Sequence, residues 1–299
     1  MEPTLQPWQF QHNVVALFRK PYARRTGRDR FMSGLSRNCA PLYGLLPAAA
    51  YTSRSQAARA VTETWVADNL YCPSCSSEEL DPTKPGTKVV DFRCPVCTEP
   101  FQLKSQSHPF RSRVLDSAYE PMIQSIANFT VPSFLFLHYH PLEWMVRDLF
   151  FVPRHFLSQS LIEKRPPLRP TAERAGWVGC NILISSLPKD ARIDAVRNGI
   201  DSSPRDVREA WRAFSFLQDR PADSRGWIAD VLACVREIRP IEFTLDDVYA
   251  FEGRLEELHK DNRNVRPKIR QQLQVLRDQG VLEFLGRGRY RVLRARQRS

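Results

Sequence analysis

The chain lacks the features that would direct it to a membrane or out of the cell. None of its apolar runs is long enough to cross a bilayer, and the most apolar segment, FLFLHYH at 134–140, is short enough to be a buried strand. The N-terminus lacks the basic-then-apolar plan of a secretory signal, and no internal repeat is visible. We therefore expect no membrane partner and a cytoplasmic location.

Acidic residues are too few to balance the basic ones. Lys and Arg number 44 against 33 Asp and Glu, which gives a formal net charge of +11. Such a charge favours polyanionic partners, nucleic acid before anionic membrane, although a merely soluble cationic surface would carry the same charge. The apolar fraction of 42% is sufficient for a core, and with 26% charged residues most of the chain should fold.

Periodicity divides the chain into three regions. Residues 1–50 contain the basic run RKPYARRTGRDR, which breaks any helical period, and we expect a disordered N-terminal extension there. Residues 51–237 form a first domain, with helices predicted over 53–71, 207–217 and 226–238 and strands over 101–104 and 134–139. Residues 238–299 form a second domain, with 238–242 as the linker and a basic tail.

The second domain has the pattern of a winged helix. Thr244 can cap a helix with Asp247 at its third position, and Asn264 can cap a second helix that Gly280 ends. VLEFL, GRGR and YRVL then predict a β-hairpin with a glycine turn. The order helix, helix, hairpin is typical of the end of a winged-helix domain.

Four of the 7 cysteines form the pattern CxxC-x18-CxxC, at Cys72, Cys75, Cys94 and Cys97. Two residues between paired cysteines allow a tight turn to direct both sulfurs at one metal, and this spacing is typical of tetrahedral zinc sites. Four thiolates leave no open position, so we predict a structural Zn²⁺. The remaining cysteines, Cys39, Cys180 and Cys234, are interpreted as buried small hydrophobes or idle thiols.

Beside the second cysteine pair lies a possible catalytic group with the pattern D-x10-Q-x-K. Gln102 and Lys104 are two residues apart in a predicted strand, so their side chains share a face. Asp91 and the Gln102 carbonyl can hold Mg²⁺ through oxygen, and Lys104 can stabilise charge that develops on a phosphate. Taken alone, the same pattern also fits an exposed strand edge.

Eight long segments carry a resemblance to a known family, and they extend from about Ser53 to Leu293. In chain order they are SQAARAVTETWV, YCPSC, VVDFRCPVC, FQLKS, TAERAGWVGCNI, SRGW, EFTLDDVYAFE and KIRQQLQVLRDQGVLEFLGRGRYRVL. In these segments the chain resembles the DpnI family of methyl-directed restriction endonucleases. The resemblance implies an α/β fold, with a restriction-endonuclease-like mixed sheet core of the PD-(D/E)xK type, a four-cysteine zinc-binding insert and a C-terminal winged helix.

The resemblance also implies a function. The family cuts double-stranded DNA at GATC sites that contain N6-methyladenine, and both domains recognise the methylated sequence. Asp91, Gln102 and Lys104 would then be catalytic, with Mg²⁺ as the catalytic cofactor. Trp177 matches the family's tryptophan beside the methyl group, although a core tryptophan between glycines would fit the sequence equally.

One departure from the family pattern leaves an alternative open. The family motif has Glu where this chain has Gln102, which keeps an oxygen donor but loses its charge. The chain would then be a reader of adenine-methylated DNA whose catalysis is weakened or lost. Glu99 has the wrong strand parity to replace the lost carboxylate, and Glu63 is a possible auxiliary acid. A zinc-bearing transcription regulator would leave Asp91 and Lys104 unexplained.

The predicted second helix of the winged-helix domain offers polar side chains for DNA recognition. Arg and Gln can contact base edges from a helix in the major groove, and hairpin arginines suit phosphate contact. A solvated polar face is the alternative for these residues. We expect a monomer that engages a two-fold symmetric site twice or nicks it sequentially. The candidate DNA contacts are Asn264, Lys268, Arg270, Gln271, Gln274, Arg287 and Arg289.

Overall fold

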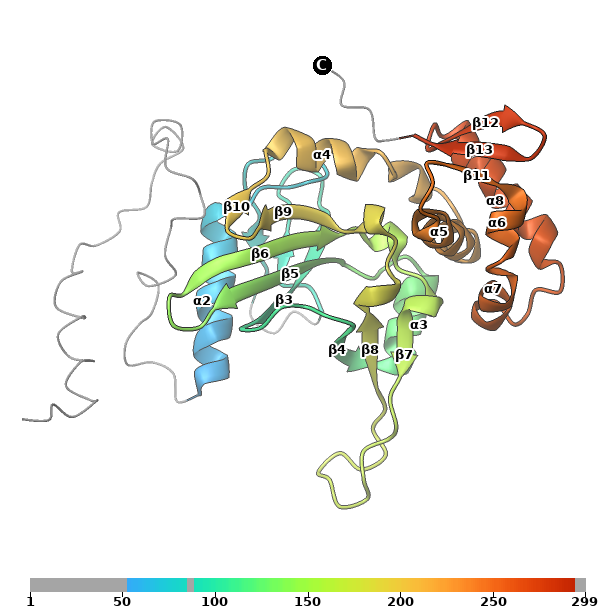
Figure 1. The fold of residues 1–299 in the computed structure, drawn as a ribbon. Coiled ribbons are helices and arrows are strands. Elements are labelled where there is room, and N and C mark those ends of the chain that lie inside the picture. The colour runs from blue at the N-terminus through green and yellow to red at the C-terminus, as the bar shows by residue number, and fades with distance from the viewer. Residues whose placement is uncertain (1–52, 85–88, 294–299) are drawn as a thin grey trace, which may run out of the picture.

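The computed structural model describes residues 53–84 and 89–293. The predicted extension over residues 1–50, and with it Cys39, lies outside the described residues. Within them the chain forms an α/β body that is followed by a smaller helical domain with its own sheet (Figure 1).

A seven-stranded mixed sheet organises the body. Its strand order is β1-β2-β3-β5-β6-β9-β10. β3 and β5 run parallel, and every other neighbouring pair is antiparallel. The strands are β1 (Asp81–Pro82), β2 (Phe92–Arg93), β3 (Pro100–Gln106), β5 (Ser133–His140), β6 (Met145–Val152), β9 (Ile193–Arg197) and β10 (Ile200–Asp201).

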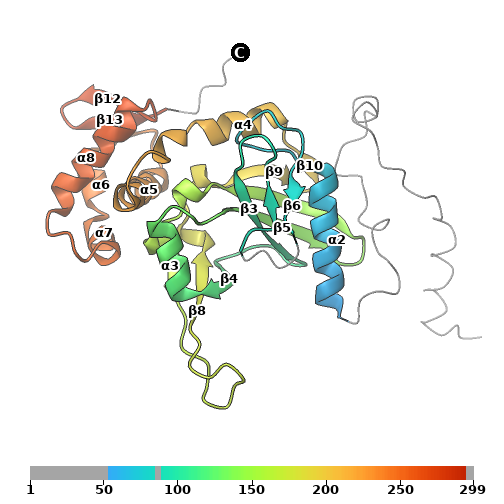
Figure 2. The ribbon, with the colours of Figure 1, turned by 180° about the vertical axis from the view of Figure 1, so that it is seen from behind.

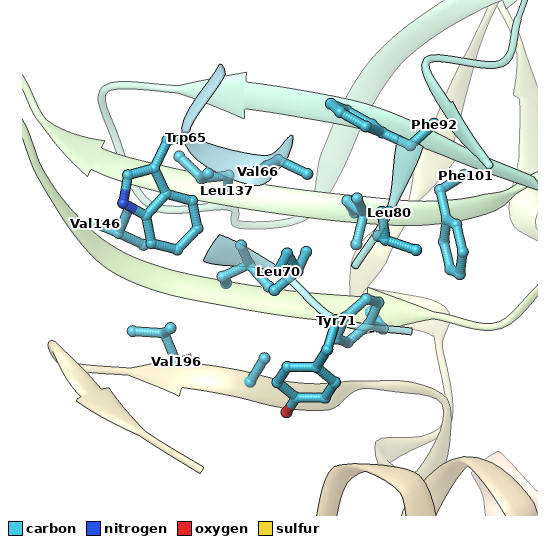
Figure 3. Close-up of a cluster of buried hydrophobic side chains, with 14 of the residues drawn as sticks. Trp65, Val66, Leu70, Tyr71, Leu80, Phe92, Phe101, Leu137, Val146 and Val196 are labelled. Atoms are coloured by element: carbon cyan, nitrogen blue, oxygen red, sulfur yellow. The ribbon is translucent and has the colours of Figure 1, made fainter. Parts of the chain in front are cut away.

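One face of this sheet is covered by α2 (Arg54–Asn69) and α4 (Pro204–Arg212). Trp65 and Val66 of α2 lie there in one buried cluster with Phe101 and Leu137 of the sheet, and Trp65 is beside Leu137 (Figure 3). α4 begins with proline at its first position, and the Ser203 side chain accepts from a backbone N–H at its N-terminus, which is favourable helix-start chemistry.

The opposite face packs against a second sheet and α3 (Tyr119–Ala127), as seen from behind in Figure 2. This sheet has the order β4-β8-β7, with all pairs antiparallel. Its strands are β4 (Arg113–Ala118), β8 (Gly179–Leu183) and β7 (Ile162–Lys164). Between β7 and β8 the chain makes a long projecting loop, residues 165–178 (Figure 1).

The C-terminal domain contains α6 (Leu245–Tyr249), α7 (Glu252–Leu258) and α8 (Val265–Asp278). They pack on a three-stranded sheet of order β11-β13-β12, made of β11 (Glu242–Thr244), β12 (Leu282–Gly286) and β13 (Arg289–Val292). The predicted capping box of Thr244 and Asp247 is confirmed, and Gly280 follows α8 with a positive φ of 71°. The domain is a helix-turn-helix fold with a small sheet.

Three local expectations for this domain are wrong. The predicted linker 238–242 ends inside β11, because Glu242 pairs with Arg291 of the hairpin. The helix predicted to continue from Thr244 divides into α6 and α7 at Phe251. Asn264 stands at the N-cap of α8, but its side chain makes no capping bond.

α5 (Ala222–Glu237) lies between the body and the C-terminal domain (Figure 1). It is buried along most of its length, and its apolar side chains share one cluster with Phe156 on the body side and with Leu273 and Leu276 of α8. This cluster includes residues on both sides of residue 238 and so marks no boundary there. The predicted division of the chain at residue 238 therefore stays a prediction. None of the described helices has both the length and the hydropathy needed to cross a membrane.

Candidate functional site

Asp91 is held against the side of β3 just before β2 begins. Its backbone N–H donates to Phe101 O at 2.9 Å, and its Oδ2 accepts from the Leu103 backbone N–H at 2.8 Å. Arg59 of α2 lies 3.4 Å from the other carboxylate oxygen. The carboxylate is 19% exposed, so it is fixed in place but still reachable from solvent.

Gln102 and Lys104 point from β3 to the face that carries α3 and the second sheet. The Lys104 Nζ lies 5.9 Å from the ring centroid of Phe134, on the parallel neighbour β5. Gln102 Oε1 is buried and has no hydrogen-bond partner among the described residues. Since buried oxygens are normally paired, this one is suited to a cation, which oxygen ligands bind. The donor set therefore fits a magnesium ion.

The structure adds a carboxylate that the sequence did not indicate. Asp116 of β4 makes a short ion pair with Lys104, and its side chain is 1% exposed. Its second oxygen, Oδ2, is buried without a partner among the described residues. Asp116 belongs to no recognisable motif, and only the packing of the second sheet on β3 brings it to Lys104.

The two other acids that the sequence offered lie elsewhere. Glu63 pairs with Arg59 at 2.6 Å, so it contacts the site only through that arginine. Glu99 is buried, accepts from Ser133 Oγ at 2.7 Å and lies 3.3 Å from Arg154. Burial raises the pKa of Glu99, although Arg154 and Ser133 oppose the shift. Glu99 is thus committed to a structural ion pair.

The four predicted zinc ligands converge. Their Sγ atoms all lie within 4.8 Å of one another, with Cys72 to Cys97 at 3.6 Å and Cys75 to Cys94 at 3.5 Å. Sulfurs about 2.3 Å from one tetrahedral zinc are roughly 3.8 Å apart, so this spacing is compatible with the metal. The group ties the chain before β1 to the turn that joins β2 and β3, three residues beyond Asp91.

Trp177 lies near the end of the projecting loop and packs over Gly179. A Cβ built at Gly179 would come within 2.7 Å of the indole ring. Backbone bonds between Leu168 and Trp177 and between Arg165 and Gly179 extend the β7–β8 hairpin into the loop. The indole is half-buried, which leaves part of the ring open to a ligand.

The candidate DNA contacts of the C-terminal domain fall into two groups. Asn264, Gln271, Gln274 and Arg287 are exposed, and Arg287 stands at the hairpin turn with a positive φ of 50°. Gln271 Oε1 also accepts from Gln272 Nε2 at 3.3 Å. The other three have partners outside α8. Lys268 points back to Asp223 and Trp227 of α5, Arg270 donates to the Tyr249 hydroxyl, and Arg289 pairs with Glu242.

A polar pocket of about 270 Å³ opens near the carboxyl end of β5. His138 in this pocket is paired in register with Gln106, two residues beyond Lys104, and its Nδ1 lies 2.8 Å from Asp148. Arg192 and Arg197 line the same pocket. It adds cationic groups to the region beyond Lys104.

Together these features define an α/β protein with a four-cysteine group suited to a metal ion and a helix-turn-helix domain. Comparison with protein-family models agrees and is more specific. The model of DpnI, the Dam-replacing family, matches residues 45–220, and that of the Dam-replacing HTH domain matches residues 223–292. The chain belongs to this DpnI-type family of restriction proteins, whose helix-turn-helix domain indicates DNA binding.

Proposed function

We propose that this chain is a type II, methyl-directed restriction endonuclease. It hydrolyses double-stranded DNA at GATC sites that contain N6-methyladenine, with Mg²⁺ as cofactor, and acts in the cytoplasm as a monomer. The observation that carries the proposal is the buried oxygen of Gln102, which has no partner among the described residues, on the strand that also carries Lys104 and whose Leu103 N–H fixes the Asp91 carboxylate. Family membership supports the same reading.

Each residue has a definite task in this reaction. Asp91 and Gln102 would hold the magnesium ion, which when bound neutralises phosphate charge and makes water a better nucleophile. Lys104 would donate to the phosphate oxygen on which negative charge grows. Water adds to phosphorus and the bond to the 3′-oxygen breaks, which leaves 5′-phosphate and 3′-hydroxyl ends.

Recognition would be divided between the two domains. Trp177 would contact the adenine methyl group with its indole face. Gln271 and Gln274 would read base edges in the major groove, while Arg287 and Asn264 would contact the backbone. Lys268, Arg270 and Arg289 would join them by exchanging their present protein partners for DNA.

The second candidate is a reader of methylated DNA without cleavage. It is favoured by the neutral side chain at Gln102, because Mg²⁺ prefers carboxylates. The two candidates share the DNA contacts and differ only in chemistry.

A plasmid digest separates them. Methylated and unmethylated plasmids are each incubated with Mg²⁺ or Mn²⁺. Three proteins are compared: the wild type, Lys104→Ala and the control Lys189→Ala, which removes an exposed lysine that belongs to no candidate site. The endonuclease predicts cleavage of methylated DNA only, lost in Lys104→Ala and retained in Lys189→Ala. Methyl-selective gel shifts without cleavage in either metal would instead establish the reader.

A further inference from the structure

Two buried oxygens in the site have no partner among the described residues, and they come from different sheets. Gln102 Oε1 is on β3 and Asp116 Oδ2 is on β4, and Asp116 is ion-paired with Lys104, which lies two residues beyond Gln102 in β3. A buried polar atom without a partner is destabilising, and more so when it belongs to a charged group. Two such atoms around one lysine therefore indicate a shared ligand.

We propose that Asp116 is a metal ligand that supplies the carboxylate missing at Gln102. This inference rests on the proposed nuclease function and concerns the same metal. The site would then consist of the carboxylates of Asp91 and Asp116 and the amide oxygen of Gln102. Two carboxylates are retained, so the charge lost at Gln102 is restored from another strand.

The ion pair with Lys104 does not by itself explain why both carboxylate oxygens of Asp116 are buried. That ion pair occupies Oδ1 and leaves Oδ2 unsatisfied in a side chain that is 1% exposed. A buried ion pair is stabilising only when its remaining lone pairs are also satisfied. A cation at Oδ2 would satisfy this condition, and Lys104 would keep its place beside the metal.

Metal binding can be measured without any cleavage. The full chain is titrated with Mn²⁺ and followed by electron paramagnetic resonance, in the absence of DNA. Asp116→Asn is expected to weaken Mn²⁺ binding at least tenfold, and Gln102→Glu in the same chain is expected to restore it. Asp190→Asn is the matched control, since Asp190 is also a largely buried, ion-paired aspartate, and it should bind as the wild type does.

The outcomes separate this inference from the proposed function. Asp116→Asn with unchanged Mn²⁺ affinity, while Asp91→Asn loses it, would overturn only the role of Asp116. A wild type that neither binds Mn²⁺ nor cleaves DNA would overturn both. Thermal melting checks the fold of each variant, and Asp116→Ser replaces Asp116→Asn if the latter does not fold.

Discussion

The position of the Trp177 indole depends on the absence of a side chain at Gly179. Because a Cβ at Gly179 would lie 2.7 Å from the indole, Gly179→Ala must displace the ring. We expect the preference for methylated over unmethylated duplex to fall about tenfold, equivalent to roughly 1.4 kcal/mol. Fluorescence anisotropy with the two duplexes measures this preference.

Gly253→Ala is the control for that experiment, since nothing lies within 4 Å of a Cβ built there. It should leave the preference unchanged. An unaltered preference in Gly179→Ala would show that the position of Trp177 does not matter for methyl recognition.

His155 makes the fold sensitive to acid. It is fully buried among Phe156, Trp211 and Arg154, and neither ring nitrogen has a partner among the described residues. Burial lowers its pKa to about 3, and Arg154 and Arg225 add to the effect. The unfolded chain takes up this proton below about pH 6.5 and the folded chain does not, so stability falls as the pH drops from there toward 3.

His155→Phe should remove this dependence. Between pH 7 and pH 5 the wild type should lose about 2 kcal/mol of unfolding free energy that the variant keeps. Urea denaturation at the two pH values tests this, with His140→Gln as the partly exposed histidine control. Equal losses in wild type and His155→Phe would count against the assignment.

At the scale of elements, individual helices, strands and caps could be predicted from the sequence, whereas the pairing of distant strands could not. The helix over 53–71, the strands around Gln102 and Phe134, and the capping box at Thr244 depend on neighbouring residues, and the structure contains all of them. The β4–β8–β7 sheet was missed because β4 and β8 pair across more than 60 residues. Asp116 was missed for the same reason, since only that packing places it beside Lys104.

The four-cysteine cluster includes Cys94, three residues beyond Asp91. Cys97→Ser should remove one zinc per chain, because three thiolates and a hydroxyl bind the metal much less tightly. We expect the melting temperature to fall by at least about 5 °C, since structural zinc contributes several kcal/mol to folding. Elemental analysis and thermal melting check both results.

Cys234→Ala serves as the control for the cluster. Cys234 is buried in the core around α5 and lies outside the four-cysteine group, so the zinc content of this variant should equal that of the wild type. If Cys97→Ser retained a full equivalent of zinc, the four-thiolate site would be wrong.

At the scale of the whole molecule, a buried carboxylate joins the two domains. Asp230 of α5 accepts from Ser160 Oγ on the body side at 3.0 Å, and the His259 Nε2, just after α7, lies 2.9 Å from it. His259 also stacks on Trp227 at 3.8 Å. Because Asp230 is only 6% exposed, these contacts between the helix-turn-helix domain and the α/β body are largely shielded from water.

Ser160→Ala breaks this connection on one side only. Asp230 keeps its contact with His259 but loses a hydrogen bond to a charged group, which is worth about 1.5–3 kcal/mol. We expect the unfolding free energy to fall by about that amount. α5 keeps its other polar contacts with the body, the Arg236–Asp190 ion pair and the bond from Arg225 to Ile126 O, so calorimetry should show one transition at a lower temperature. Ser185→Ala removes a weaker, exposed hydroxyl bond and should shift stability by less than about 0.5 kcal/mol. An unshifted transition in Ser160→Ala would mean that the Ser160–Asp230 bond contributes nothing to holding α5 on the body.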